Sequence, residues 1–276
     1  MTVQPQSPTT ALDRLRDELR RLERVVVAFS GGADSAFLAW VAHDTLGADR
    51  AQCVTAVSPS LAPEEELACR DLAAEWGLRW EVVHTDELAN PAYSANDGDR
   101  CFHCKTALMD LTEPVAAAAG ATVVLGVNLD DLGDHRPGQA AAGQRGARFP
   151  LVDAGFTKDD VRSWSKRLGL RTWDKPAAAC LASRVPYGTP VTLTVLSEVA
   201  RAESALRRMG FRQLRVRHYG DTARLELDGP ELARAVAERE AVVSAVKGAG
   251  YRYVTLDLEG FRSGNLNAAL TTAEVR

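Results

Sequence analysis

Apolar and polar residues alternate in blocks along the first half of the chain. Short apolar runs typical of buried strands are separated by segments whose apolar residues recur at helical spacing. The predicted strands are residues 25–29, 52–57, 79–84 and 122–127. The predicted helices are residues 10–22, 36–46, 63–76 and 102–119, with a capping box at Thr10 and Asp13. Strands alternating with helices predict an α/β fold whose doubly wound parallel sheet is covered on both faces.

The pattern changes in the second half. Residues 129–148 and 172–190 show no clear period and are predicted as long loops, separated by a helix that opens with a capping box at Thr157 and continues to Leu168. A helix (193–209), two strands (213–218 and 223–227), a helix (231–247) and a strand (251–257) follow. We therefore expect a first domain over residues 1–188 and a smaller α+β domain with a mixed or antiparallel sheet over residues 189–276.

The first predicted strand runs into Ser30-Gly31-Gly32-Ala33-Asp34-Ser35 and then a helix. Strand, glycine turn and helix together direct backbone N–H groups and a positive helix end at an anion. No lysine follows the glycines, which excludes the G-x-x-x-x-G-K-[ST] loop. An ordinary tight turn is the alternative. The pattern S-G-G-x-D-S resembles the pyrophosphate loop (PP-loop) of the ATP pyrophosphatases. Gly126, at the end of another predicted strand, would lie at the same edge of the sheet.

Three cysteines are candidate ligands. Cys101 and Cys104 have C-x-x-C spacing, and Cys180 lies in the second loop. They could hold an iron–sulfur cluster with one iron free of protein ligands. Zinc with His103, a redox pair, or a single reactive Cys180 are alternatives. Cys53, in a strand, and Cys69, in a helix, are predicted to be small core residues.

Arginines mark the second half of the chain. Arg215 and Arg217 share one face of a predicted strand, where two guanidinium groups suit a phosphate or carboxylate. A solvated strand face balanced by Glu226 is the alternative. Arg262 lies in a glycine turn after the last strand. Glu203 is either an acid/base group or a surface carboxylate.

Composition excludes some functions. The chain of 276 residues is 46% hydrophobic and 25% charged, with a net charge of −4, which argues against nucleic acid or an anionic membrane as partner. No apolar run is long enough to span a bilayer, and residues 1–10 lack signal-peptide features. We expect a cytoplasmic protein whose five cysteines form no structural disulfides.

Taken together, these motifs resemble the LarE family of ATP-dependent sulfur transferases, and the likeness covers nearly the whole chain. Its motifs are residues 30–35, Asp134-His135-Arg136-Pro137-Gly138, Ser183-Arg184-Val185-Pro186-Tyr187-Gly188, Arg215-Val216-Arg217 and residues 251–264. The resemblance implies that carboxylates of a pyridinium biscarboxylate mononucleotide are adenylylated and then converted to thiocarboxylates, in the biosynthesis of a nickel-pincer nucleotide.

The resemblance also implies residue roles. ATP would bind Ser30, Gly31, Gly32, Asp34, Ser35 and Gly126, with Mg²⁺ near Asp34 and with Lys158 nearby. The substrate's phosphate and carboxylates would be held by Arg184, Arg215, Arg217 and Arg262, with Glu203 close by. We further expect a homo-oligomer.

The family obtains sulfur in two ways. One type sacrifices a single cysteine, at the position where this chain has Ala179. The other holds a [4Fe–4S] cluster on three cysteines and passes on a sulfide taken from a separate source. Cys101, Cys104 and Cys180 predict the cluster type. Alternatives are sacrifice of Cys180, another pyrophosphate-loop enzyme such as a tRNA thiolase or an amide-forming ligase, and a non-catalytic ATP-binding zinc or redox switch.

Overall fold

The computed structural model describes residues 10–133, 137–176 and 179–262. Its larger sheet has four parallel strands in the order β3-β2-β1-β4. The strands are β1 (Val25–Ala28), β2 (Ala51–Val57), β3 (Arg79–His84) and β4 (Thr122–Leu125). The chain first winds from β1 to β3 and then returns to the other side of β1. The topological switch point therefore lies between β1 and β4, where ligands of such sheets bind.

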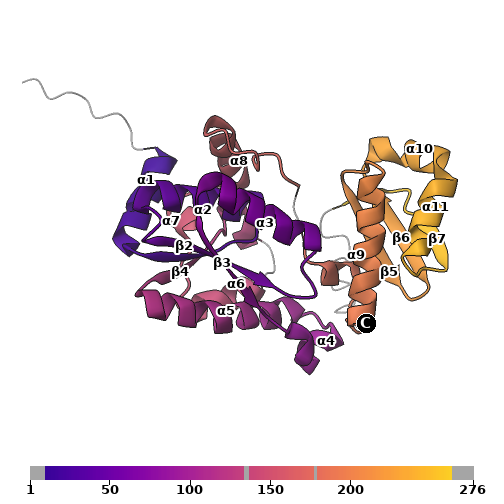
Figure 1. The fold of residues 1–276 in the computed structure, drawn as a ribbon, viewed down its shortest axis with the longest axis horizontal. Coiled ribbons are helices and arrows are strands. Elements are labelled where there is room, and N and C mark those ends of the chain that lie inside the picture. Colours follow the sequence, from indigo (N-terminus) through magenta and orange to yellow (C-terminus); the bar gives the residue numbers. More distant parts are fainter. Residues whose placement is uncertain (1–9, 134–136, 177–178, 263–276) are drawn as a thin grey trace, which may run out of the picture. The chain divides into compact units, whose positions relative to one another are not determined.

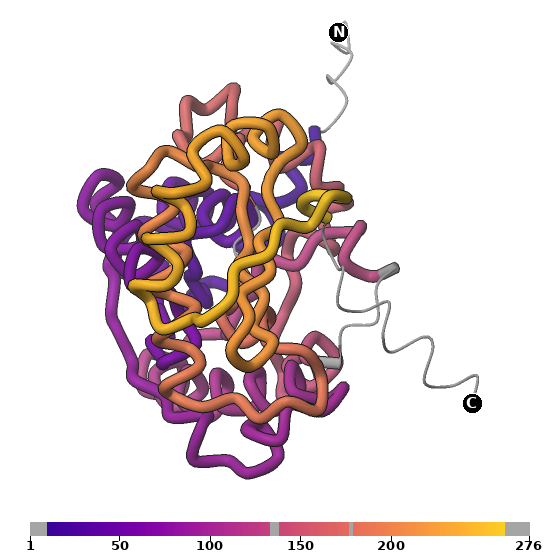
Figure 2. The backbone as a smooth tube through the Cα atoms, turned by 90° about the vertical axis from the view of Figure 1, so that its right-hand side faces the viewer, coloured from indigo at the N-terminus to yellow at the C-terminus, as the bar shows by residue number. Residues whose placement is uncertain are grey.

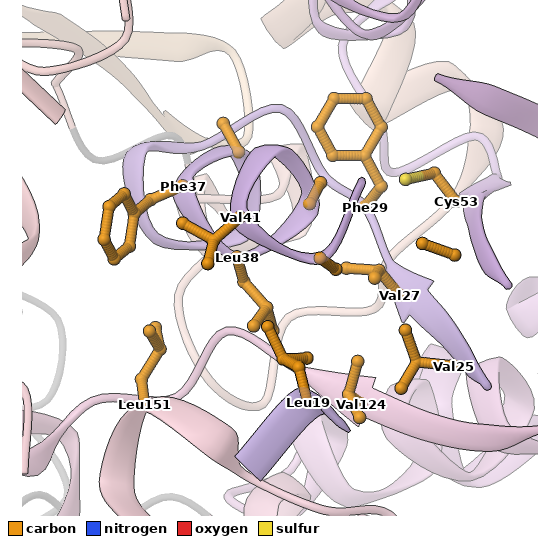
Figure 3. Packing of buried hydrophobic residues seen from close by; sticks show 14 of the residues in the cluster. Leu19, Val25, Val27, Phe29, Phe37, Leu38, Val41, Cys53, Val124 and Leu151 are labelled. Atoms are coloured by element: carbon orange, nitrogen blue, oxygen red, sulfur yellow. The ribbon is translucent and has the colours of Figure 1, made fainter. Parts of the chain in front are cut away.

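Helices cover both faces of this sheet (Figure 1). They are α1 (Ala11–Leu22), α2 (Ala33–Leu46), α3 (Pro63–Trp76), α5 (Arg100–Ala119), α6 (Pro137–Gln144), α7 (Pro150–Asp153) and α8 (Lys158–Arg167). Because strand side chains alternate, Val25 and Val27 pack under α1 and α2, as Figure 3 shows, whereas Val26 packs with Met109 of α5. The predicted α/β fold with a doubly wound parallel sheet is confirmed.

The segment predicted as one long loop, residues 129–148, is partly helical. It contains the short 3-10 helix η2 (Leu129–Gly133) and α6. The prediction was wrong because, after Pro137, α6 consists of alanines, glycines and glutamines, which give no polar–apolar period. Ala142 is nevertheless fully buried among β4 and α5 side chains. The second predicted loop also contains a short 3-10 helix, η3 (Leu181–Arg184).

The smaller sheet is mixed, which is one of the two forms predicted, mixed or antiparallel. Strand β6 (Thr222–Leu227) pairs antiparallel with β5 (Leu214–Tyr219) and parallel with β7 (Tyr253–Leu256). The helices α9 (Leu193–Arg208), α10 (Gly229–Ala237) and α11 (Arg239–Gly248) accompany it. Figure 2 traces the chain from α9 to β7 in orange and yellow. Its core joins Leu206 of α9, Val216 and Leu225 of the sheet, and Val246 of α11.

One predicted helix is two helices. The expected continuous helix over residues 231–247 breaks at Glu238, between α10 and α11. No glycine or proline marks this position. Instead, Arg234 of α10 donates to the carbonyl oxygen of Met209 and stacks on the ring of Phe211. A tertiary anchor therefore fixes the direction of α10.

Contacts divide the chain into two compact units. The first contains residues 1–57, 64–85 and 105–177, and the second contains residues 58–63, 86–104 and 178–276. The short elements η1 (Glu87–Ala89) and α4 (Pro91–Ala95) belong to the second unit. The boundary that we expect at residue 188 remains a proposal. No helix among the described residues has the length and apolar character needed to cross a membrane.

Candidate active site

The glycine turn after β1 opens helix α2. Gly31 has a φ of +67°, a left-handed conformation that favours glycine. The hydroxyl groups of Ser30 and Ser35 lie 3.0 Å apart, and the Ser30 backbone N–H donates to Ser35 Oγ at 3.3 Å. Gly32 caps α2 without a side-chain hydrogen bond. The helix therefore begins with a short, closed turn whose N–H groups and positive helix end can meet an anion.

Gly126 follows β4 and touches this turn. A Cβ atom at residue 126 would lie 2.8 Å from the backbone nitrogen of Ser35 and 2.9 Å from the carbonyl carbon of Asp34. Only glycine allows β4 to approach the start of α2 so closely. The sequence predicted that the two strand ends meet, and the structure brings them together at the switch point.

The Asp34 carboxylate is held from two sides. Its Oδ2 accepts from the Lys158 ammonium, and its Oδ1 accepts from Asn128 Nδ2 at 3.1 Å. Lys158 is the first residue of α8, which starts at the predicted Thr157–Asp160 capping box. Its backbone N–H also donates to Asp130 Oδ2 at 2.7 Å. The structure thus joins the two residues that the sequence analysis placed at the ATP site, Asp34 and Lys158.

A second lysine reaches the turn. Lys175 Nζ donates to the Gly31 carbonyl oxygen at 3.0 Å and to Glu65 Oε2 at 2.6 Å. Beneath Gly31 lies the thiol of Cys69, which a Cβ at residue 31 would meet at 2.9 Å. Burial is the main reason why the pKa of Cys69 rises to about 11. Sequence reasoning assigned no role to Lys175 or Glu65.

The other predicted core cysteine is confirmed as well. Cys53 is buried in the same apolar cluster as Cys69, and burial raises its pKa to about 12. Neither thiol is therefore available as a thiolate ligand near neutral pH.

Cys101, Cys104 and Cys180 all lie in the second unit. Cys104 and Cys180 pack against one apolar cluster around Tyr93, and Cys101 is exposed at the start of α5. The thiols share neighbours: burial raises the pKa of Tyr93, and Cys180 and Cys104 raise it further. The pKa of Tyr187 rises through burial and through Cys101 and Cys180, despite the opposing effect of Arg100.

A single metal ion has no ready site here. Within the described ranges, no three His, Cys, Asp or Glu side chains converge on one ion. A cubane cluster makes a different demand, because each of its irons takes one terminal thiolate rather than three. The three thiols lie in one unit, Cys180 shares Tyr93 with Cys104 and Tyr187 with Cys101, and together they have the donor chemistry of such a cluster.

Glu203 of α9 is fully buried, not a surface carboxylate. Arg184 binds it through Nε and Nη2 at 2.8 and 2.9 Å, Arg207 donates at 2.8 Å, and the Val216 N–H donates at 3.1 Å. Burial alone would raise the pKa of Glu203, but the charges and hydrogen bonds of these partners lower it overall. Arg184 Nη1 also donates to the carbonyl oxygens of Ala179 and Cys180 at 2.6 and 2.9 Å.

The paired arginines of β5 are buried as well, so the alternative of a solvated strand face is wrong. Arg217 donates to Glu226 at 2.7 Å and to the Ser183 carbonyl oxygen at 2.8 Å. Arg215 lies over the ring of Phe261 at 5.0 Å, and burial lowers its pKa to about 10. Arg262, in contrast, is half exposed and pairs with Glu259.

Parts of two predicted motifs lie outside the described residues: Asp134, His135 and Arg136 of one, and Ser263 and Gly264 of the other. Three polar contacts escaped the sequence analysis, those of Asn128, Lys175 and Glu65. Asn128 could have been expected near Ser30, since it follows the predicted strand of residues 122–127, whose end lies at the same edge of the sheet.

Known proteins resemble the whole chain, although no protein-family model matches it. An uncharacterized protein from Synechocystis is 47% identical over 94% of this chain and 98% of its own length. An uncharacterized protein from Methanocaldococcus jannaschii is 25% identical over 91% and 97%. The pyridinium-3,5-bisthiocarboxylic acid mononucleotide synthase of Lactiplantibacillus plantarum is 38% identical over 258 residues, 93% of this chain and 94% of that enzyme. Because this identity extends over nearly all of both chains, the chain belongs to the LarE family of pyridinium-3,5-bisthiocarboxylic acid mononucleotide synthases.

Proposed function

We propose that this protein is an ATP-dependent sulfur transferase that converts the carboxylates of pyridinium-3,5-biscarboxylic acid mononucleotide to thiocarboxylates. The observation that carries the proposal is the turn at the start of α2, closed by Gly126 and flanked by the Asp34–Lys158 pair. The name of the Lactiplantibacillus plantarum relative supports the substrate class.

The first half-reaction activates a carboxylate. A carboxylate oxygen of the substrate attacks the α-phosphorus of ATP, the bond from that phosphorus to the pyrophosphate oxygen breaks, and a mixed anhydride with AMP forms. The N–H groups at the start of α2 and the ammonium of Lys158 would stabilise the charge of the departing pyrophosphate. Mg²⁺ usually takes one or two protein carboxylates together with phosphate oxygens. Asp34 is a carboxylate suited to that role, in competition with Lys158.

The second half-reaction inserts sulfur. A sulfide attacks the acyl carbon of the mixed anhydride, and AMP leaves with the electron pair of the broken carbon–oxygen bond. Cys101, Cys104 and Cys180 would hold a [4Fe–4S] cluster that supplies this sulfide when bound, replenished from a separate sulfide source. The alternative within the same function is that Cys180 itself gives up its sulfur.

The buried arginines of the second unit would bind the anionic substrate. Arg215 and Arg217 are buried, where water screens their attraction to an anion less than at the surface. Glu203 and Glu226 fix the guanidinium planes of Arg184 and Arg217. Glu203 has its oxygens committed to arginines and to a backbone N–H, so we assign it to positioning Arg184. Arg262 remains a proposed substrate ligand. The homo-oligomer and the cytoplasmic location also remain proposals.

Anaerobic purification tests the proposal. We expect a brown protein that absorbs near 400 nm, and the Cys101→Ser, Cys104→Ser and Cys180→Ser variants should each lose iron, whereas Cys53→Ala should retain it. With ATP and the biscarboxylate substrate, the wild type should release AMP and pyrophosphate and form thiocarboxylate. A colourless zinc protein without this turnover would support a zinc or redox switch instead. Mass spectrometry that finds H₂S lost from Cys180 after turnover would establish sacrifice.

A further inference from the structure

Lys175 is placed where a nucleotide phosphate would compete for it. Its ammonium contacts the carbonyl oxygen of Gly31, the residue that turns the chain toward the N-terminus of α2. The segment that carries Lys175 is 144 residues away in sequence, and the Lys175 side chain reaches this turn. The ammonium is therefore at the rim of the anion-binding turn.

The turn does not need this lysine for its shape. The Ser30–Ser35 hydrogen bonds close it, the positive φ of Gly31 sets its path, and Cys69 packs beneath it. The Lys175–Glu65 pair is also partly exposed, with 20% and 25% of the two side chains accessible. Ion pairs of this exposure contribute little stability.

The surrounding charge explains why a cation is needed there. Helix α3 begins with Glu64, Glu65 and Glu66. Next to the turn, Glu65 and Glu66 act on the Cys69 thiol with a sign opposite to that of Lys175. A triphosphate near these carboxylates would be repelled unless a mobile cation met it. Lysine suits this task, because its charge lies at the end of a flexible stem and it binds phosphate as a point charge.

From these contacts we propose that Lys175 is a phosphate ligand of the ATP site, and that Glu65 holds it until nucleotide binds and then releases it. The exchange breaks no covalent bond: the ammonium leaves one carboxylate oxygen and takes a phosphate oxygen. This inference rests on the proposed function, since it requires that ATP binds at the α2 turn.

The exchange predicts opposite effects for the two partners. Lys175→Met removes the phosphate ligand, so it should weaken nucleotide binding. Glu65→Gln removes the competitor but keeps the side-chain shape, so it should strengthen binding, because the cost of freeing Lys175 falls. A lysine that only braced the turn would give losses of the same sign for both variants.

Calorimetric titration of the full chain with the magnesium complex of a non-hydrolysable ATP analogue, and separately with AMP, tests this proposal. We expect Lys175→Met to bind the analogue about 10- to 100-fold more weakly, and Glu65→Gln to bind it about 3- to 10-fold more tightly. AMP affinity should change less than about 2-fold, since AMP lacks the β- and γ-phosphates. Lys175→Arg should recover most of the affinity, and Glu64→Gln is the matched control on the same helix turn.

The outcomes separate the two levels of inference. Equal losses for both variants, for both ligands, would overturn the phosphate role and establish a brace. Unchanged affinities would overturn it also. A wild type that binds neither ligand would instead refute the proposed ATP chemistry. Thermal unfolding of each variant shows whether it is folded, and an unfolded Lys175→Met leaves the Glu65→Gln titration to decide.

Discussion

Arg184 and Glu203 form a two-pronged ion pair, Nε to Oε1 at 2.8 Å and Nη2 to Oε2 at 2.9 Å, in which both side chains are almost completely buried. Such a pair fixes geometry more than it adds stability. Replacing one of the two partners nevertheless costs folding stability, because the charge of the other partner stays buried without its counter-ion. The pair therefore makes the second unit sensitive to any change at Glu203.

Glu203→Gln should destabilise the second unit by about 3–5 kcal/mol near neutral pH, because Arg184 and Arg207 lose their shared carboxylate. Chemical denaturation measures this loss. The pKa of Glu203 lies below its ordinary value of 4.5 in the folded protein. A lowered folded-state pKa stabilises the fold above the unfolded value and ceases to do so as the pH falls through the folded value. The deficit of the variant relative to wild type should therefore be constant above about pH 5 and shrink below about pH 4.

The same denaturation series carries its own control. Glu240→Gln changes a glutamate in the same unit whose side chain is 90% exposed, and it should stay within about 0.5 kcal/mol of wild type at every pH. A Glu203→Gln deficit that persists undiminished at pH 3 would show that shape, not charge, is responsible.

Asp34→Asn should abolish most ATP cleavage while the fold survives. The variant keeps an amide that can contact Asn128 but removes the charge that pairs with Lys158 and that would bind the proposed Mg²⁺. We expect release of AMP and pyrophosphate to slow by about 100-fold or more. Asp44→Asn is the matched control, since it lies on the same helix and pairs with Arg16 on the surface. Loss of activity in both variants would contradict a specific role for Asp34.

Gly126→Ala should disturb the turn at the start of α2 through a single methyl group. That methyl would collide with the Asp34–Ser35 backbone, which cannot move as a side chain can. Overpacking of this kind costs about 1–3 kcal/mol, and we expect weaker ATP binding together with a lower melting temperature. Gly143→Ala in α6 is the control, because its Cβ would meet Phe149 at an ordinary 3.5 Å. A fully stable Gly126→Ala with normal ATP affinity would refute the close-approach argument.

Arg215→Met should separate substrate binding from ATP binding. Burial that lowers the pKa of Arg215 to about 10 also means that its charge is costly to keep. The apolar replacement should thus fold well, yet the substrate should bind about 10- to 100-fold more weakly because a charged hydrogen-bond donor is gone. Titration with each ligand measures the difference. Arg217→Met, which strips Glu226 of a partner, should lose stability as well. Equal losses of ATP and substrate affinity in Arg215→Met would refute the assignment.

Much of the fold could be predicted from the sequence, because its signals are local. Apolar runs such as residues 25–29 and capping residues such as Thr10 and Thr157 act within a few neighbours, and the structure confirms both caps. The parallel direction of the strands followed from the alternation of strands and helices, whereas their order around β1 was not predicted. Helix α6 was missed because its burial depends on distant side chains, and the break at Glu238 was missed because Arg234 is anchored elsewhere.

The candidate site divides in the same way. The S-G-G-x-D-S turn is a contiguous motif, so Asp34 could be recognised directly. Lys175 lies 144 residues from Gly31, and its contact depends on how the chain folds back. The pairing of Arg184 with Glu203 likewise could not be predicted from sequence spacing. The structure shows that Glu203 is buried and pairs with Arg184, and that it does not face solvent.

Arg184 Nη1 holds Ala179 and Cys180 by their backbone oxygens, and it also donates to the hydroxyl group of Ser183. The path of residues 179–180 therefore does not depend on which of the two positions carries a thiol. A cysteine could migrate from one position to its neighbour while the frame stays the same. The two sulfur sources that the resemblance implies, a sacrificed cysteine at residue 179 or a cluster ligand at residue 180, would then require no change in the fold of this segment.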